Sequence, residues 1–109
     1  MSQDIEKNLR WELDDKLREL LPDNWHLYFQ PPGERGLDYP CLVYAKSSGD
    51  TAYANNKDYM YHRRYELTFI YDDPDDETPR NVMRQLDYCR ADRHFVTANL
   101  NHDTCVLYY

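Results

Sequence analysis

The segment from Tyr59 to Tyr71 alternates in polarity over a length that favours a single β-strand. Tyr65, Leu67 and Phe69 fall on one side of an extended chain, with polar or charged residues between them. Successive side chains of a strand point to opposite faces, so a second layer must cover the apolar side. The sequence therefore predicts a sheet with one covered face and one largely hydrated face.

The segment Ser2–Leu21 supplies the first part of that covering layer. Its apolar residues recur at spacings of three and four, which is the pattern of one stripe on a helix. The stripe consists of Ile5, Leu9, Leu13, Leu17, Leu20 and Leu21. Ser2 is a suitable N-cap and Pro22 ends the helix.

A second helix is predicted after the acidic run Asp72–Glu77. Thr78 is expected as its N-cap, Pro79 occupies the first helical position, and the helix is expected to end near Arg90. Its expected buried stripe is Val82, Met83, Leu86 and Cys89. The acidic run lacks the glycine and the terminal glutamate of a calcium loop, so we expect a hydrated turn that favours the helix N-terminus.

Four shorter strands complete the expected fold. They are Trp25–Gln30, Tyr39–Lys46, His94–Thr97 and Thr104–Tyr108, the last two joined by the polar segment Ala98–Asp103. The prediction is one α+β domain over residues 1–109, in the order α-β-β-β-α-β-β. Both helices are expected on one face of a mainly antiparallel sheet of four to five strands.

The charge balance limits the classes of partner. The chain carries 20 acidic and 13 basic side chains, a formal net charge of −7. Proteins that grip nucleic acid through phosphates need a basic surface, so tight binding to DNA is not expected. Aromatic residues make up 15% of the chain. A binder of single strands that stacks bases on tyrosines therefore stays open as an alternative.

The three cysteines, Cys41, Cys89 and Cys105, are widely spaced and odd in number. This favours reduced, mostly buried thiols in a protein matured in cytosol over a secreted disulfide scaffold. The segment Met1–Leu21 is charged throughout and does not resemble a signal peptide. No apolar run reaches the roughly 20 residues of a membrane helix, so no membrane association is expected.

No catalytic or metal-binding constellation is expected. His94, His102, Asp103 and Cys105 cluster near the C-terminus without the spacing of a zinc site. His102 and Asp103 cannot both point inward from a strand, so we expect them to fix a loop by hydrogen bonds. The cysteines are expected in apolar positions, where a thiol behaves as a small hydrophobe. We predict a non-enzymatic protein with no cofactor and no metal.

The tyrosines are more numerous than one small core can hide, and tyrosine is enriched in protein interfaces. The segment Ser47–Asp58 is also longer than a usual hairpin connection. We expect a neighbouring subunit to hold it, the alternative being a surface loop without a role. The candidate interface residues are Tyr53, Asn55, Asn56, Lys57, Tyr59, Tyr61, Tyr108 and Tyr109.

Several short motifs carry a resemblance to a known family. They are Tyr39–Tyr44, Ala54–Lys57, Arg64–Ile70 with Asp73–Asp75, Asp92–Phe95, Asn99–Asp103 and Leu107–Tyr109. In these motifs the chain resembles the tail terminator, or head–tail joining, proteins of long-tailed bacteriophages and prophages. The family has no fixed functional residues, so no site is transferred from it.

The resemblance implies a virion structural protein at the tail–head junction, assembled in the cytoplasm of the bacterial host. Its partners would be further copies of itself in a ring, expected to be a hexamer, the major tail tube protein, and the head connector or stopper protein. DNA would pass through the ring without tight binding. Two alternatives stay open: another connector protein such as the stopper, and a small acidic adaptor or inhibitor that binds a host protein.

Overall fold

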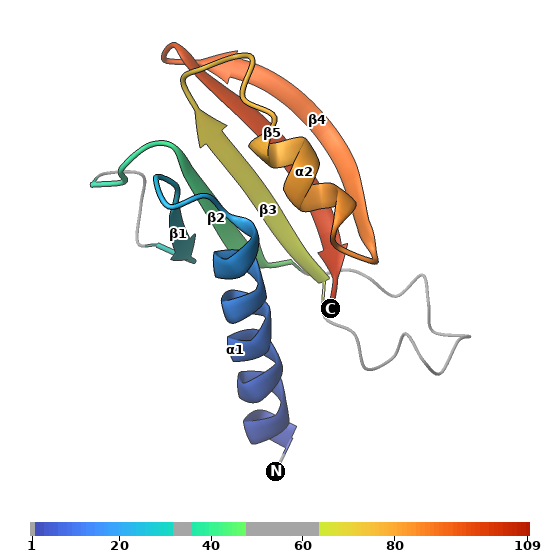
Figure 1. The fold of residues 1–109 in the computed structure, drawn as a ribbon. Helices are drawn as coiled ribbons and strands as arrows, with labels where there is room; N and C mark the ends of the chain where they lie inside the picture. The colour runs from blue at the N-terminus through green and yellow to red at the C-terminus, as the bar shows by residue number, and fades with distance from the viewer. Residues whose placement is uncertain (1, 32–35, 48–63) are drawn as a thin grey trace.

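A computed structural model describes residues 2–31, 36–47 and 64–109, with side chains described from residue 10 onward. The elements are α1 (Ser2–Leu20), β1 (His26–Phe29), β2 (Cys41–Lys46), β3 (Arg64–Tyr71), α2 (Thr78–Arg84), β4 (Cys89–Thr97) and β5 (Leu100–Tyr108) (Figure 1). The predicted α+β class is confirmed. Neither helix in this described part is long and apolar enough to cross a membrane.

The strands form one five-stranded sheet in the order β1-β2-β3-β5-β4. The sheet is mixed, because β1 runs parallel to β2 while β2, β3, β5 and β4 pair antiparallel. β3 is the central strand, β5 lies next to it, and β4 forms an edge with β5 as its strand neighbour. This arrangement brings the chain segments 64–71 and 100–108 side by side.

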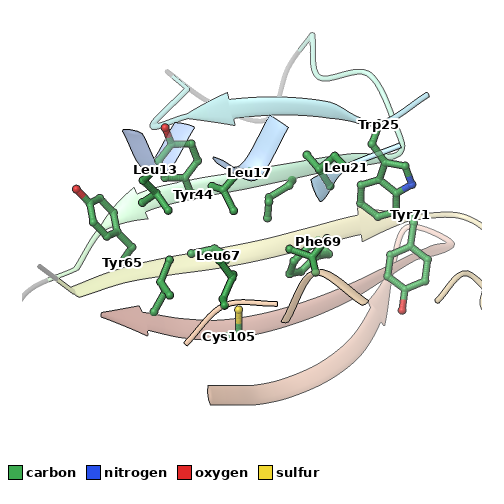
Figure 2. Packing of buried hydrophobic residues seen from close by; sticks show 14 residues of the cluster. Leu13, Leu17, Leu21, Trp25, Tyr44, Tyr65, Leu67, Phe69, Tyr71 and Cys105 are labelled. Atoms are coloured by element: carbon green, nitrogen blue, oxygen red, sulfur yellow. The ribbon is translucent and has the colours of Figure 1, made fainter. Parts of the chain in front are cut away.

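Both helices pack on the same face of the sheet (Figures 1 and 2). The layer over this face consists of Leu13 and Leu17 of α1, Val82 of α2, and Leu21 and Leu86, which lie just after the two helices. The strands bury Leu42, Tyr44, Tyr65, Leu67, Phe69, Tyr71, Cys105 and Leu107 against them. The predicted packing of Leu13 and Leu17 with Leu67 and Phe69 is therefore confirmed. The side chain of Leu9, predicted for the same contact, lies outside the described residues.

Trp25 closes one end of this core just after α1. Its ring meets Phe69 edge-on at 6.1 Å between centroids and lies 6.0 Å from Tyr71. Such aromatic pairs add a directional term to the burial of apolar area. Trp25 thus ties the end of α1 to the middle and end of β3.

The second helix is shorter than predicted. It ends at Arg84 rather than near Arg90, and Thr78 is its first residue while Glu77 holds the cap position. The backbone N–H groups of Gln85 and Leu86 bond three residues back, to Val82 and Met83, which closes the last turn. Cys89 consequently lies at the start of β4, and its prediction as a helical core residue was wrong.

The last two strands are longer than predicted, at nine residues each. Ala98 and Asn99 have φ of 53° and 63°, the left-handed values that a two-residue hairpin turn requires. The predicted polar connection Ala98–Asp103 is therefore only this turn, and Leu100–Asp103 belong to β5. The sequence pattern concealed β4 because most of its residues are exposed and show no alternation.

Candidate subunit interface

The predicted interface residues fall largely in one stretch of sequence. Tyr53, Asn55, Asn56, Lys57, Tyr59 and Tyr61 lie outside the described residues, as does most of the connection predicted over Ser47–Asp58. The structure places the other two, Tyr108 and Tyr109.

Both C-terminal tyrosines are half-buried in their own subunit. Tyr108 ends β5, pairs with Arg64 of β3, and donates its backbone N–H to the carbonyl oxygen of Tyr88 at 3.0 Å. Tyr109 packs against the core. Burial and the nearby charge of Glu12 raise the pKa of its phenol. These two candidate interface residues therefore pack on their own sheet and core, and only part of each side chain is exposed.

The sheet face opposite the helices, here called the open face, carries the main surface feature. A hollow of about 630 Å³ lies over it. It is lined by Gln30, Pro31, Leu37, Val43, Ala45, Glu66, Thr68, Ile70, Arg93, Phe95, His102 and Thr104. The strand register explains the set, since Val43 pairs with Thr68 and Ile70 with His102, which puts both pairs on one side.

Three side chains form a stack at the β4 side of this hollow. The rings of Phe95 and His102 lie parallel, 4.7 Å apart at 12°. The guanidinium carbon of Arg93 sits 4.8 Å from the Phe95 ring centroid on the same side of the sheet. The stack explains how His102 is only 8% exposed on the face opposite the two described helices. It provides a flat aromatic and cationic surface.

The charge on the open face differs from the charge of the whole chain. The strand register places three basic residues, Arg64, Arg90 and Arg93, and one acidic residue, Glu66, on this face. Asp92 belongs to the same face, because its carboxylate accepts a hydrogen bond from the Thr104 hydroxyl at 3.3 Å. The face is thus slightly basic on a protein of net charge −7. A partner that meets it is favoured if it presents carboxylates.

The acidic run after β3 is a hydrated turn, as the sequence predicts. Asp73 accepts the backbone N–H of Asp75 at 3.0 Å, and Asp76 accepts that of Thr78 at 2.9 Å. The second bond satisfies a backbone donor at the start of α2, in the role that the sequence assigned to Thr78. Within the described ranges, no three His, Cys, Asp or Glu residues are grouped so as to hold a metal ion.

Asp103 organises the opposite side of β5. Its carboxylate accepts the Tyr71 hydroxyl at 2.6 Å through Oδ2 and contacts His94 Nδ1 through Oδ1. Burial, and then the bond to this carboxylate, raise the pKa of Tyr71 well above its usual range, so the phenol keeps its proton. The prediction that Asp103 and His102 fix a loop was wrong in place: both lie within β5 and face opposite sides.

The sequence reading missed the stack of Arg93, Phe95 and His102 and the link from Tyr71 through Asp103 to His94. The stack and the contact with His94 depend on the register of β4 on β5, and the bond to Tyr71 depends on the pairing of β3 with β5, which are far apart in the chain. Comparison of the chain with protein-family models, with curated proteins and with solved structures finds no match.

Proposed function

We propose that the chain is a phage tail terminator or a closely related head–tail joining subunit. In this role copies of the chain form a closed ring on the last ring of the tail tube and join it to the head connector. The motif resemblance supports the proposal. The two helices also favour a terminator over the stopper, which in such connectors is usually an all-β barrel.

The observation that carries the proposal is the open face. One side of the sheet is covered by α1 and α2, whereas the other holds an apolar and aromatic hollow that Arg93 borders. A monomer with no partner has little use for such a hollow, and large exposed apolar surfaces mark interaction sites. We assign this face to contact with the next copy of the chain.

A ring joins two different patches of each subunit, head to tail. The acidic turn Asp72–Glu77 lies at the end of β3 and is mostly exposed, so it offers carboxylates complementary to Arg90 and Arg93. We therefore pair this turn of one copy with the arginine side of the open face of the next. The remaining negative charge would repel DNA in the axial channel and let it pass.

The test is assembly in the presence of tail tubes that lack the protein. Purified chain alone is expected to scatter light as a monomer, and added tubes should convert it to a ring whose mass is several times larger. A protein that stays monomeric and does not bind the tubes would contradict the proposal.

A charge exchange tests the pairing itself. Arg93→Glu should abolish ring formation while lowering the free energy of unfolding by no more than about 1 kcal/mol, the value of its exposed contact with the Phe95 ring. Asp75→Arg should do the same. A mixture of the two variants should restore one complementary contact for each mixed pair of neighbours. Rings that tolerate either single variant would place the interface elsewhere.

A further inference from the structure

Two cysteines predicted to be separate lie together on the helix-covered face. Cys89 is the first residue of β4 and pairs with Leu107 of the neighbouring strand β5. Cys105 lies two residues before Leu107 in that strand. Their Sγ atoms are 3.3 Å apart, within hydrogen-bonding distance. Cys105 is fully buried in the core, where Figure 2 shows it beside Leu67, and Cys89 is half-buried at the margin.

The third cysteine is an internal reference. Cys41 lies on β2, on the other side of β3 from β5, and is fully buried. Burial, and then the charge of Asp38, raise its pKa to about 11. A thiol of this kind is a poor nucleophile at neutral pH.

The pair is asymmetric in a way that suits stepwise chemistry. The hydrogen bond with Cys105 lowers the pKa of Cys89, whereas the same contact and burial raise the pKa of Cys105. Cys89 also borders a surface hollow of about 300 Å³ that Asp87, Tyr88 and Arg90 line as well, whereas Cys105 is only 1% exposed. A disulfide oxidant therefore reaches the more accessible and more acidic thiol of Cys89 first.

We propose that Cys89 and Cys105 form a reversible disulfide across β4 and β5 when the folded protein meets a low-molecular-weight disulfide such as oxidised glutathione. The Cys89 thiolate attacks one sulfur of the oxidant and releases one glutathione thiolate. Cys105 then loses its proton and attacks the Cys89 sulfur of the mixed disulfide, which releases the second glutathione. Two protein thiols are oxidised and one glutathione disulfide is reduced to two thiols.

The disulfide would link the edge strand β4 covalently to β5. β4 has one strand neighbour in the described sheet, and the disulfide would close a loop over residues 89–105 around the hairpin turn. Closing a loop of this length stabilises the folded state mainly by restricting the unfolded chain. The inference does not rest on the proposed function. If that function holds, the disulfide would form after particles leave the reducing cytoplasm.

The test uses the purified full-length chain with an excess of oxidised glutathione, followed by unfolding and alkylation. The number of thiols that react with iodoacetamide should fall from three to one, and the remaining one should be Cys41. The melting temperature of the oxidised protein should rise by roughly 10 °C and return on reduction. Three reactive thiols after treatment, or a bond that involves Cys41, would overturn the proposal.

Two variants separate the steps. Cys105→Ser should stop the reaction at a glutathione adduct on Cys89, visible in the intact mass. Cys89→Ser should leave Cys105 unmodified, because it is only 1% exposed. Cys41→Ser is the matched control and should form the bond as the unaltered chain does. Equal adduct formation on Cys89 and Cys105 in the single variants would contradict the assigned order of attack.

Discussion

The two faces of the central sheet are made by the same strands and have opposite construction. On the helix-covered face, Leu67 and Phe69 of β3 are fully buried beneath Leu13 and Leu17. On the open face, Glu66 and Thr68 of the same strand border a hollow in which Phe95 lies only half-buried. The apolar core therefore lies on the helix-covered face, and the open face is the one that we propose for contact between copies of the chain. Substitutions on the two faces should separate these roles.

The largest effect on stability is expected from Leu13→Ala. Leu13 is 0% exposed and sits in the core between α1 and the sheet. Removing its side chain should lower the free energy of unfolding by about 2–5 kcal/mol, from lost apolar burial and the cavity left behind. Urea unfolding measures this. Leu20→Ala, at a half-buried position on the same helix, is the matched control and should cost less; equal losses would show that the helix face is misassigned.

Asp103→Ala should have the next largest effect. It leaves the buried Tyr71 hydroxyl without its acceptor and removes the contact with His94. An unsatisfied buried polar group costs about 1–3 kcal/mol, measurable by the same urea unfolding. The double variant with Tyr71→Phe should recover part of the loss, because it also removes the stranded hydroxyl. If it recovers nothing, the link between β3 and β5 does not contribute as described.

Alkaline pH should weaken the helix-covered face through two tyrosines. Burial is the main cause that raises the pKa of Tyr44 and Tyr71 above the ordinary value of 10.0, followed by their hydrogen bonds to Asp14 and Asp103. Below pH 10 both states are protonated and this stability is fully present. As the pH rises above 10 the unfolded chain ionises first, so stability falls.

The check is the free energy of unfolding at several pH values between 9 and about 11.5. Tyr44→Phe should make the decline shallower, because one of the two protons no longer contributes. Tyr39→Phe changes an exposed tyrosine and serves as the matched control. If the free energy of unfolding declines equally steeply with pH in the unaltered chain and in Tyr44→Phe, the phenol of Tyr44 does not contribute to this pH dependence.

The smallest effect on stability, and a large effect on assembly, is expected from Phe95→Ala. Its ring stacks on His102 at the open face, and the loss should be about 1 kcal/mol, the value of an aromatic pair. Ring formation on tail tubes should nevertheless fail. Val96→Ala is the matched control. Val96 is the next residue after Phe95 in β4, is 61% exposed, and has its side chain on the opposite side of the sheet. If both variants assemble equally well, the open face is not the interface between copies of the chain.

The parts of the fold that the sequence predicts well are those in which polarity follows burial. The stripe that includes Leu13 and Leu17 identifies α1, and the alternation around Leu67 identifies β3. The edge strand β4 was underestimated because Arg90–His94 are exposed on both sides and lack a period. Cys89 continued the helical spacing of Val82 and Leu86, so the pattern hid the end of α2 at Arg84.

The candidate surface was harder to predict than the fold. His102 and Asn101 are polar yet buried. His102 stacks on Phe95, and the side-chain amide of Asn101 donates hydrogen bonds to the carbonyl oxygens of Tyr71 and Asp72. Their burial depends on partners in other strands, which the local sequence does not identify. The approach of Cys89 to Cys105 likewise follows from the register of β4 on β5.

The most direct test of the central claim is electron microscopy of particles made by a phage or prophage whose copy of this gene is deleted. The account predicts filled heads without tails, beside unjoined tails of irregular and excessive length. Supplying the unaltered chain should restore joined particles, and supplying Phe95→Ala should not. Normal joined particles in the absence of the chain would contradict its assignment as the subunit that completes the tail.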